Sequence, residues 1–486
     1  MKYTISVCNL FFFFFCNSGD VLDPTCRKLL TIMTSRYRVE YALKSHRRDE
    51  FIEWIKGLLA VPFVLHSRHN KFDFKVNHID EDSLLEEEER CTQEVTRRYL
   101  EIFNDIEQLV EGSRRLSALE PDSRNASRLN QLVPTVGQFF TELPLQDAFT
   151  IEDSRRCISR RVLVSPSFND VRVCLNTAQI LALARHSKNE CSPHSLKLIT
   201  FDGDLTLYDD SESIISGSPV TERIITLLEM DFFIGAVTAA GYPGQGGAPQ
   251  YYNRLKGLID EIRKSTSLTP DQKENFLVMG GESNYLFRYR NSLGNLQYVN
   301  GDEWYLPIMQ EWDKKQVDTL VDKAENHLKF LRRLLKLDDY SKTSIIRKER
   351  SVGIVPVKGY EILRENLEEM VLSCSIELGE VVGKLPQPSD PQDKIRFCAF
   401  NGGWDVWIDI GDKSLGIAAL QKYLCRDVKY DKRCPITNAE TLHVGDQFAS
   451  VGANDFRARL SACTVWISNP KETVALLDDL LHYLLT

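Results

Sequence analysis

Two aspartates directly follow a short apolar segment near the middle of the chain. Leu198 and Ile199 belong to an apolar run that predicts a buried strand, and Asp202, Gly203 and Asp204 come just after it. Because ligands of open α/β sheets bind beyond the carboxyl ends of the strands, both carboxylates are well placed for chemistry. Two acids in one pocket repel each other unless a cation or a proton offsets their charge, which favours a bound divalent ion. A strand-ending turn with solvated acids is the alternative, since Asp-Gly is also a common turn pair.

A second apolar run ends in a hydroxyl group. Residues 232–237 predict another buried parallel strand, which stops at Thr238 and the small residue Ala239. A hydroxyl and a small-residue loop at such a strand end could donate hydrogen bonds to a phosphate. The glycine-rich residues 241–250 that follow contain no Gly-Lys-Ser/Thr sequence, so they predict a flexible loop and not a P-loop.

A third apolar run, at residues 441–444, also ends in an acid. Gly445 would form the turn after this strand and Asp446 lies at its carboxyl end, while Asp455 belongs to an Asn-Asp pair that opens the next helix. His443 lies inside the strand, where a satisfied core histidine is the favoured interpretation. Lys413 lies between the second and third strands, beside a turn ahead of a helix.

An aromatic residue is flanked by acids in a further predicted strand. Alternation over residues 405–410 places Asp405, Trp407 and Asp409 on one face and three aliphatic residues on the other. A flat aromatic ring with a carboxylate suits a nucleobase and a sugar hydroxyl. A half-exposed tryptophan on an antiparallel sheet is an equally good interpretation.

The composition restricts the class of protein. A chain of 486 residues is long enough for two or three domains, and its formal charge of −9 argues against a nucleic-acid-binding surface. The 12 cysteines form no Cys-x-x-Cys pair, which predicts reduced thiols and a cytoplasmic protein. No segment approaches the roughly 20 apolar residues of a membrane span, so no membrane partner is expected.

The N-terminal third carries no catalytic constellation. Residues 1–32 have the charged end and apolar core of a signal peptide, but Met33 opens a stretch like a normal protein start. We therefore expect residues 1–32 to be an extension outside the fold. Residues 33–165 predict amphipathic helices with a regulatory or oligomerisation role, and residues 112–128 predict a mobile connection.

The remaining chain alternates strands and helices, with one interruption. Residues 166–258 and 395–486 predict an α/β core with a doubly wound parallel sheet. Residues 259–394 contain a long helix and strand-like pieces, which predict an inserted α+β domain that extends into the strands near residues 395–410. Inserted caps of this kind commonly close over a site and exclude water.

The order of these motifs resembles the haloacid-dehalogenase-like (HAD) phosphotransferase superfamily with a type-2 cap. The match extends further, because the chain from Met33 to its C-terminus is similar to the fungal IMP-specific 5′-nucleotidase family. Among the segments that carry this resemblance are TFDGDLTLYDD, VTAAGY, VMGGESNYLFRY, DVWIDIGDKSLGI and ETLHVGDQFASVGANDF.

The resemblance implies a phosphatase mechanism. Asp202 would attack the 5′-phosphate of IMP and form an aspartyl-phosphate, and Asp204 would act as general acid and then as general base. Thr238 and Lys413 would hold the phosphate oxygens. Inosine and phosphate would be the products, in purine nucleotide degradation or salvage.

The resemblance also implies a magnesium ion. Asp202, Asp446 and the main-chain carbonyl of Asp204 would be its ligands, and Asp455 would orient this metal shell.

Substrate, effector and assembly follow from the same resemblance. Asp405 and Trp407 on the cap strand and Arg254 on the core side would contact IMP, together with Thr238 and Ala239. A homo-tetramer activated by ATP is implied, with the helical N-terminal region as the place for both. A cluster of basic residues could meet an effector phosphate, although a solvated basic helix end is favoured: Lys44, Arg47 and Arg48.

Two alternatives remain open from the residues. A sugar-phosphate phosphatase or phosphomutase of the same superfamily would share the chemistry but needs no base-stacking aromatic. A nucleotide-binding pseudo-phosphatase would have no need for an attacking carboxylate at Asp202.

Overall fold

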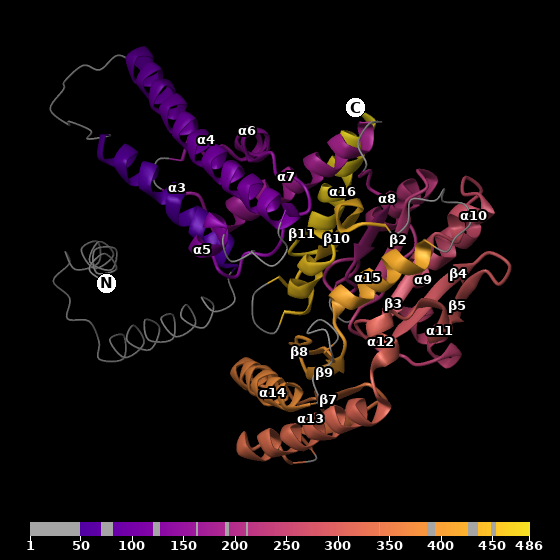
Figure 1. The fold of residues 1–486 in the computed structure, drawn as a ribbon. Helices are drawn as coiled ribbons and strands as arrows, with labels where there is room; N and C mark the ends of the chain where they lie inside the picture. The colour runs from indigo at the N-terminus through magenta and orange to yellow at the C-terminus, as the bar shows by residue number, and fades with distance from the viewer. Residues whose placement is uncertain are drawn as a thin grey trace. The chain divides into compact units, whose positions relative to one another are not determined.

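Figure 1 shows the computed structural model of the chain. It describes residues 49–69, 81–119, 127–161, 164–189, 194–209, 212–339, 341–385, 394–425, 436–448 and 453–486. The predictions for residues 1–32 and for the basic cluster Lys44, Arg47 and Arg48 therefore lie outside the described residues.

The N-terminal region is helical in its described part. Its helices are α3 (Glu50–His69), α4 (Glu81–Leu119), α5 (Arg128–Leu132), α6 (Leu145–Arg156) and α7 (Phe168–Lys188). The buried side of α4 recurs at three- and four-residue steps, as a one-sided amphipathic helix requires; its members are Val95, Tyr99, Phe103, Ile106 and Val110. This helix continues through Leu119, so the prediction of a connection from residue 112 is wrong at its start. Glu111 stabilises the extra turns through ion pairs with Arg114 and Arg115, at 2.8 and 2.7 Å.

The core is a seven-stranded sheet in the order β11-β10-β1-β2-β3-β4-β5. Its parallel strands are β1 (Leu198–Phe201), β2 (Phe233–Thr238), β3 (Phe276–Gly280), β10 (Thr441–Gly445) and β11 (Cys463–Trp466), and β4 (Tyr285–Arg290) and β5 (Asn295–Val299) continue it antiparallel. The chain leaves β1 toward β2 and later returns to the other side of β1 at β10. This reversal of strand order is the topological switch point where α/β proteins bind ligands.

Helices cover both faces of this sheet. Leu415 and Leu420 of α15 (Lys413–Leu424) pack on one side with Phe233 of β2. On the other side, one apolar cluster joins the sheet to α8 (Pro219–Glu229), α9 (Ala248–Lys264) and α16 (Pro470–Leu485). The predicted α/β fold with a doubly wound parallel sheet is confirmed. Shorter helical turns are η2 (Gln245–Gly247), α10 (Pro270–Lys273), α11 (Gly301–Trp304), α12 (Pro307–Glu311), η4 (Asn438–Glu440) and η5 (Asn454–Leu460).

A second, antiparallel sheet has the order β6-β7-β9-β8. Its strands are β6 (Thr343–Arg347), β7 (Ser351–Pro356), β8 (Phe397–Asn401) and β9 (Val406–Ile410), and α13 (Lys314–Leu334) and α14 (Arg364–Lys384) pack on it and on each other (Figure 1). We call these four strands and two helices the cap.

The cap is smaller than the sequence predicts. The strands β3, β4 and β5 fall within residues 259–394, but they pair with the core sheet, starting with Ile234 opposite Phe276. The cap sheet begins only at Thr343, and it ends with β8 and β9, as expected for strands near residues 395–410.

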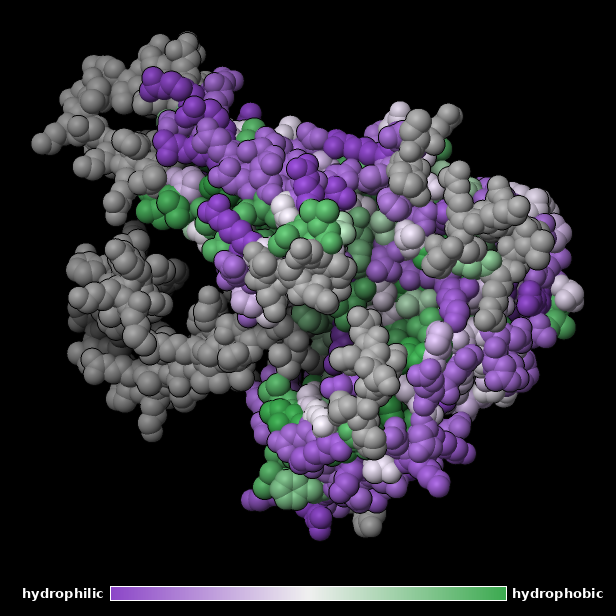
Figure 2. Space-filling view, viewed as in Figure 1, coloured by the Kyte–Doolittle hydropathy of each residue, from purple (hydrophilic) through white to green (hydrophobic). Residues whose placement is uncertain are grey.

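No helix in the described part of the chain is long and apolar enough to cross a membrane. On the face shown in Figure 2, hydrophilic residues cover most of the described surface and hydrophobic residues form separate patches.

Candidate active site

Asp202 is held at the carboxyl edge of the core sheet. Its main-chain N–H donates to the carbonyl of Val444 at 2.9 Å, which continues the pairing of β1 with β10 by one residue. The N–H of Gly203 donates to Oδ1 of Asp202 at 2.8 Å. A Cβ atom on Gly203 would lie 2.7 Å from the Tyr208 hydroxyl, so the tight turn depends on glycine. Leu205, one residue after Asp204, has a φ of 58°, and such strained backbone is frequent at functional sites.

Lys413 reaches Asp202 from the first turn of α15. Asp412 caps this helix by accepting a hydrogen bond from the N–H of Leu415 at 3.1 Å, which fixes the start of the helix below the sheet edge. The Nζ atom of Lys413 lies 2.8 Å from Oδ1 of Asp202 and 2.5 Å from Oδ1 of Asp455. Burial alone would lower the pKa of Lys413, but the two carboxylates raise it above its usual range, so the side chain is a permanent cation.

Asp455 is saturated with protein donors. Besides Lys413, its Oδ1 atom meets Nε2 of His443 at 3.0 Å, and its Oδ2 atom accepts from the N–H of Gln447 at 2.9 Å. A Cβ atom on Gly445 would lie 2.4 Å from Oδ2, so only glycine allows Asp455 to come this close to β10. Burial would raise the pKa of Asp455, but Lys413 and His443 lower it below its usual range.

His443 is the satisfied core histidine that the sequence predicts. Its ring is fully buried, and its Nδ1 atom lies 2.9 Å from the hydroxyl of Thr200 while Nε2 faces Asp455. Burial lowers the pKa of His443, which favours the neutral ring. The ring therefore contacts Asp455 from within the core, on the side of β10.

Three carboxylates converge within metal-binding distance. One oxygen from each of Asp202, Asp446 and Asp455 lies within 4.8 Å of the other two, so this group could hold a metal ion. Burial raises the pKa of Asp202 to about 7, and burial followed by the charge of Asp202 raises the pKa of Asp446 well above its usual range. The Oδ1 atom of Asp446 is buried and has no hydrogen-bond partner among the described residues. A divalent cation that prefers oxygen ligands would offset the repulsion between these carboxylates. It would also give Oδ1 of Asp446 a partner, so the residues fit magnesium.

Core and cap residues line one cavity beside these carboxylates. The core contributes Asp202, Asp204, Thr238, Ala239, Asp446 and Asn454, and the cap contributes a turn that begins at the end of β8 with Phe400, Asn401, Gly402 and Gly403. The predicted residues at the ends of β1, β2 and β10 are thus brought together. The hydroxyl of Thr238 accepts a hydrogen bond from the N–H of Ala240 at 3.2 Å, so its own proton is available to a ligand.

Arg254 contacts Asp204. Its Nη1 atom lies 3.3 Å from Oδ1 of Asp204 and donates to the carbonyl of Glu212 at 3.4 Å. Arg254 was expected to contact IMP. In the structure its side chain pairs with Asp204, the residue with the predicted acid–base role.

Trp407 and Asp405 form a pair of their own on the cap. The indole Nε1 of Trp407 donates to Oδ2 of Asp405 at 2.9 Å. Neither residue lines the carboxylate cavity, but Phe400, which does, is directly opposite Trp407 in the pairing of β8 with β9. Asp409, on the same strand face, is buried, and burial raises its pKa to about 7.

Comparison with known proteins agrees with this geometry. The family model described as IMP-specific 5′-nucleotidase matches residues 33–477. The chain is 58% identical over 482 residues to IMP-specific 5′-nucleotidase 1 of Debaryomyces hansenii, covering 93% of this chain and 99% of the relative. It is 46% identical over 488 residues to the Saccharomyces cerevisiae protein of the same name, covering 93% and 100%. The chain belongs to the IMP-specific 5′-nucleotidase family.

Solved structures of a more distant relative share the fold. The IMP-bound mutant of Plasmodium falciparum IMP-nucleotidase has a TM-score of 0.68 and 31% identity, covering 90% of this chain and 96% of that one. The ATP-bound form of the Plasmodium protein has a TM-score of 0.68 and 30% identity, covering 96% and 94%. Both the resemblance to this nucleotidase family and the prediction of a phosphoric monoester hydrolase are confirmed.

Sequence reasoning missed two ionisable residues near the site, of which Glu282 is fully buried and Lys348 is partly buried. Glu282, in the turn between β3 and β4, is fully buried with a φ of 63°, and its Oε1 accepts from Nδ2 of Asn454 at 3.3 Å. Lys348, in the turn between β6 and β7, donates to the main-chain carbonyl of Gly241 at 2.9 Å. The only signal for Glu282 was its place in the VMGGESNYLFRY segment, and Lys348 lies in a run of charged residues that resembles any solvated turn.

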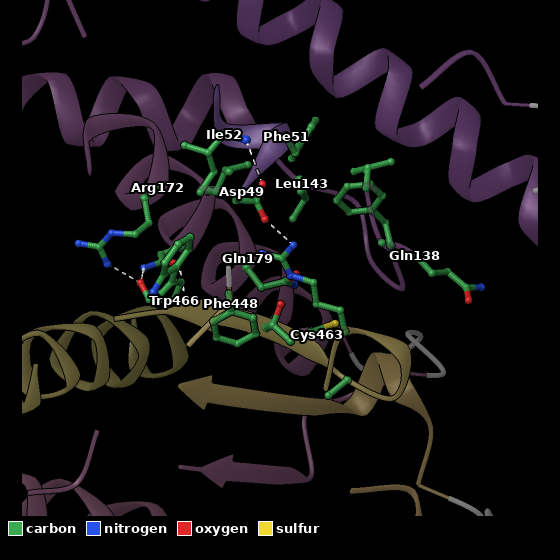
Figure 3. A pocket seen from close by; sticks show the side chains of 18 of the residues that line it. Asp49, Phe51, Ile52, Gln138, Leu143, Arg172, Gln179, Phe448, Cys463 and Trp466 are labelled. Atoms are coloured by element: carbon green, nitrogen blue, oxygen red, sulfur yellow. Dashed lines mark hydrogen bonds and ion pairs between the residues drawn. The ribbon is translucent and has the colours of Figure 1, made fainter. Parts of the chain in front are cut away.

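A second cavity lies between the N-terminal helices and β11 of this nucleotidase, apart from the carboxylate site (Figure 3). Asp49 and Arg172 are buried charged residues in its wall. Asp49 pairs with Arg459 at 2.5 Å, and Arg172 donates to the carbonyl of Trp466 and to Oε1 of Glu472. The charged groups in the wall thus bind protein atoms, and they tie the N-terminal helices to the catalytic core.

Proposed function

We propose that the chain hydrolyses IMP to inosine and phosphate through an aspartyl-phosphate on Asp202. The observation that carries the proposal is the convergence of Asp202, Lys413, Asp446 and Thr238 at the switch point of the sheet. The names of the family and of its fungal relatives support IMP as the substrate, and the Plasmodium relative is described as IMP-bound.

In the first half-reaction, an oxygen of Asp202 attacks the phosphorus atom in line. The bond from phosphorus to the ribose 5′-oxygen breaks as the bond to Asp202 forms, and Asp204 donates its proton to the departing oxygen. The ammonium of Lys413 and the hydroxyl of Thr238 would hold the equatorial oxygens, where charge spreads in the transition state. Arg254 would keep Asp204 turned toward the leaving group.

In the second half-reaction, water attacks the phosphorus of the aspartyl-phosphate. Asp204, now ionised, accepts the proton of this water, and the bond from phosphorus to Asp202 breaks. Phosphate leaves and both aspartates return to their starting states. Using one residue as acid and then as base is efficient here, because the leaving alkoxide needs the proton that water later supplies.

Magnesium fits as the cofactor. Asp202 and Asp446 would bind it together with the main-chain carbonyl of Asp204, and Asp455, already saturated by protein donors, would orient the shell. When bound, the ion would neutralise phosphate charge and favour the ionised form of Asp202 that attacks.

Regulation and assembly are part of the same proposal. We propose activation by ATP, supported by the Plasmodium relative described as ATP-bound. We also propose a homo-tetramer that uses the helical N-terminal region, where no catalytic residue was predicted. A cytoplasmic location agrees with the seven cysteines that the structure describes, all of which are unpaired.

The test is phosphate release from a panel of IMP, GMP, AMP and hexose phosphates, with magnesium or EDTA and with or without ATP. IMP should be the best substrate, EDTA should abolish turnover, and ATP should raise activity. Asp202→Asn should abolish turnover, and Asp204→Asn should lower it by about 10²–10⁴-fold. Equal turnover of hexose phosphates would instead favour a sugar-phosphate phosphatase, and phosphate release by the Asp202→Asn protein at the parent rate would exclude Asp202 as the nucleophile.

A further inference from the structure

Lys348 joins the cap to the core at the loop that carries Thr238. The residue lies in the turn between β6 and β7 of the cap, and its Nζ donates to the carbonyl of Gly241 at 2.9 Å. Gly241 follows Thr238 by three residues in the loop after β2. The ammonium therefore lies on the same core loop as the expected phosphate contact, although it comes from a different domain.

The same ammonium covers the ring of Trp407. Its Nζ atom lies 4.4 Å from the centroid of the indole and 5.8 Å from the ring centroid of Tyr242. Both distances are within the range of cation–π contacts. The position over Trp407 is the one that a stacked base would take.

The opposite face of the indole is closed by the cap sheet. Gly353 of β7 is directly opposite Trp407 of β9, and a Cβ atom on Gly353 would lie 2.4 Å from Cδ2 of the indole. The ring thus lies against the main chain of β7, and only a glycine permits this. A base that stacks on Trp407 must use the face where Lys348 lies, so it would displace this ammonium from the ring face to the edge of the base.

Burial lowers the pKa of Lys348 below its usual range, and two nearby carboxylates partly offset this effect. Asp409 and Asp405 both raise the pKa of Lys348, against the larger effect of burial, which lowers it. Asp405 is itself fixed by its hydrogen bond from the Trp407 indole. The aromatic face, the cation and the two acids form one group on the side of the cap sheet that faces away from its helices.

An ammonium can donate hydrogen bonds but cannot accept them. A 6-oxopurine such as hypoxanthine or guanine presents two acceptors on one edge, N7 and O6, whereas adenine presents an acceptor and the donor N6 amino group. We propose that Lys348 is a specificity-determining residue that binds the N7/O6 edge of a 6-oxopurine stacked on Trp407. This inference rests on the proposed nucleotidase function and names the contact that selects its substrate class.

The substitution Lys348→Met tests this assignment, because it keeps the aliphatic stem and removes the charge. The values of kcat/KM for IMP and GMP should both fall by about 10- to 150-fold, the range for loss of one hydrogen bond to a charged group. Those for AMP and for ribose 5-phosphate, which has no base, should change by less than about threefold. Lys358→Met, at an exposed lysine just beyond β7, is the matched control and should leave all four values unchanged.

Three results would overturn the assignment. An equal fall of kcat/KM for IMP and ribose 5-phosphate would show that Lys348 only connects the cap hairpin to the Gly241 loop. An unchanged kcat/KM for every substrate would show that Lys348 does not contribute to substrate selection. A loss for IMP without a loss for GMP would exclude the shared N7/O6 edge. Preference of the parent enzyme for hexose phosphates over IMP would instead contradict the proposed function, independently of Lys348.

Binding of products keeps the test valid if Lys348→Met folds poorly. The inactive Asp202→Asn protein that keeps Lys348 should bind inosine more tightly than adenosine. Adding Lys348→Met should remove that difference in affinity. Thermal unfolding of both proteins shows whether they are folded. Lys348→Arg should retain part of the preference, since a guanidinium can donate to N7 and O6 as well. Equal binding of inosine and adenosine by the parent would contradict the proposal.

Discussion

Lys413 and Asp455 form an ion pair from which solvent is excluded, with 2.5 Å between Nζ and Oδ1 and no exposed surface on either side chain. The same ammonium lies 2.8 Å from Asp202, so one cation serves the expected nucleophile and the carboxylate behind it. Removing one partner of such a buried pair strongly destabilises the folded protein, because the other charge stays buried without its counter-ion. Lys413 therefore has a structural role in addition to its proposed contact with phosphate.

We expect Lys413→Met to lose both activity and stability. Loss of one preorganised donor to the transition state lowers turnover by about 10²–10³-fold, and two buried carboxylates without their counter-ion destabilise the fold by roughly 3–5 kcal/mol. Phosphate release from IMP and urea unfolding measure the two effects. Lys422→Met, on the same helix, is the control and should be near neutral in both assays. A stable but inactive Lys413→Met protein would show that the pair with Asp455 contributes nothing to folding.

The strand ends of the site were predictable because their strands are fully buried. Near-continuous apolar runs mark β1, β2 and β10, and parallel strands of this kind end at a common edge of the sheet. Asp202, Thr238 and Asp446 therefore had to lie close together once the strand order was right. That order is long-range information, which the resemblance to a known family supplied and the alternation of strands and helices alone does not.

The cap boundary and the second cation could not be predicted in the same way. The apolar run of β3 shows that this strand is buried but not which sheet it joins. The long helix that follows it favoured the prediction that the inserted domain begins at residue 259. Lys348 lies in a charged turn without periodicity, and its contacts are with Gly241 and Trp407, more than fifty residues away in either direction. The contact with Trp407 exists only after the cap sheet has formed, and the contact with Gly241 only after the cap and the core are both folded.

Gly353→Ala should weaken recognition of the base without affecting the chemistry. The added Cβ atom would lie 2.4 Å from the indole of Trp407, so the ring must move away from β7. We expect kcat/KM for IMP to fall by roughly 10-fold or more, and turnover of ribose 5-phosphate to stay near that of the parent. Gly359→Ala, where no atom lies near the added carbon but φ is 93°, controls for backbone strain in the same sheet region. An equal effect of Gly353→Ala on both substrates would contradict a role of Trp407 in base binding.

Asp409 should make the stability of the cap dependent on pH. Burial raises the pKa of this carboxyl to about 7 in the folded protein, above its usual value of 3.8. The folded state then binds more protons than the unfolded state between these values, so the free energy of unfolding falls as pH rises from about 4 to 7. Asp409→Asn removes this effect. The free energy of unfolding of this variant, relative to that of the parent, should therefore increase by roughly 2–3 kcal/mol from pH 5 to pH 8. Urea unfolding at both pH values measures the gain, and the exposed Asp302→Asn should show none.

Arg459 joins the start of the N-terminal helices to the turn that carries Asp455. It pairs with Asp49 at 2.5 Å and lies over the rings of Phe448 and Phe456, at 5.2 and 5.4 Å from their centroids. Asp49 also accepts a hydrogen bond from the N–H of Ile52 at 3.0 Å, in the first turn of α3. One carboxylate thus holds α3 and η5 together.

A double-mutant cycle on Asp49→Asn and Arg459→Met should reveal this link as a coupling free energy of about 1.5–3 kcal/mol, the range for hydrogen bonds to charged groups. Each single variant should lose most of the stability that the double variant loses, because either substitution leaves a largely buried partner unpaired. Urea unfolding followed by tryptophan fluorescence measures all four proteins. The exposed pair of Arg97 and Glu101, at 3.9 Å on α4, is the matched control, and its cycle should give no more than about 0.5 kcal/mol. Equal couplings for the two pairs would mean that Arg459 and Asp49 interact as an ordinary surface ion pair, and that the N-terminal helices are held to the core by their apolar contacts alone.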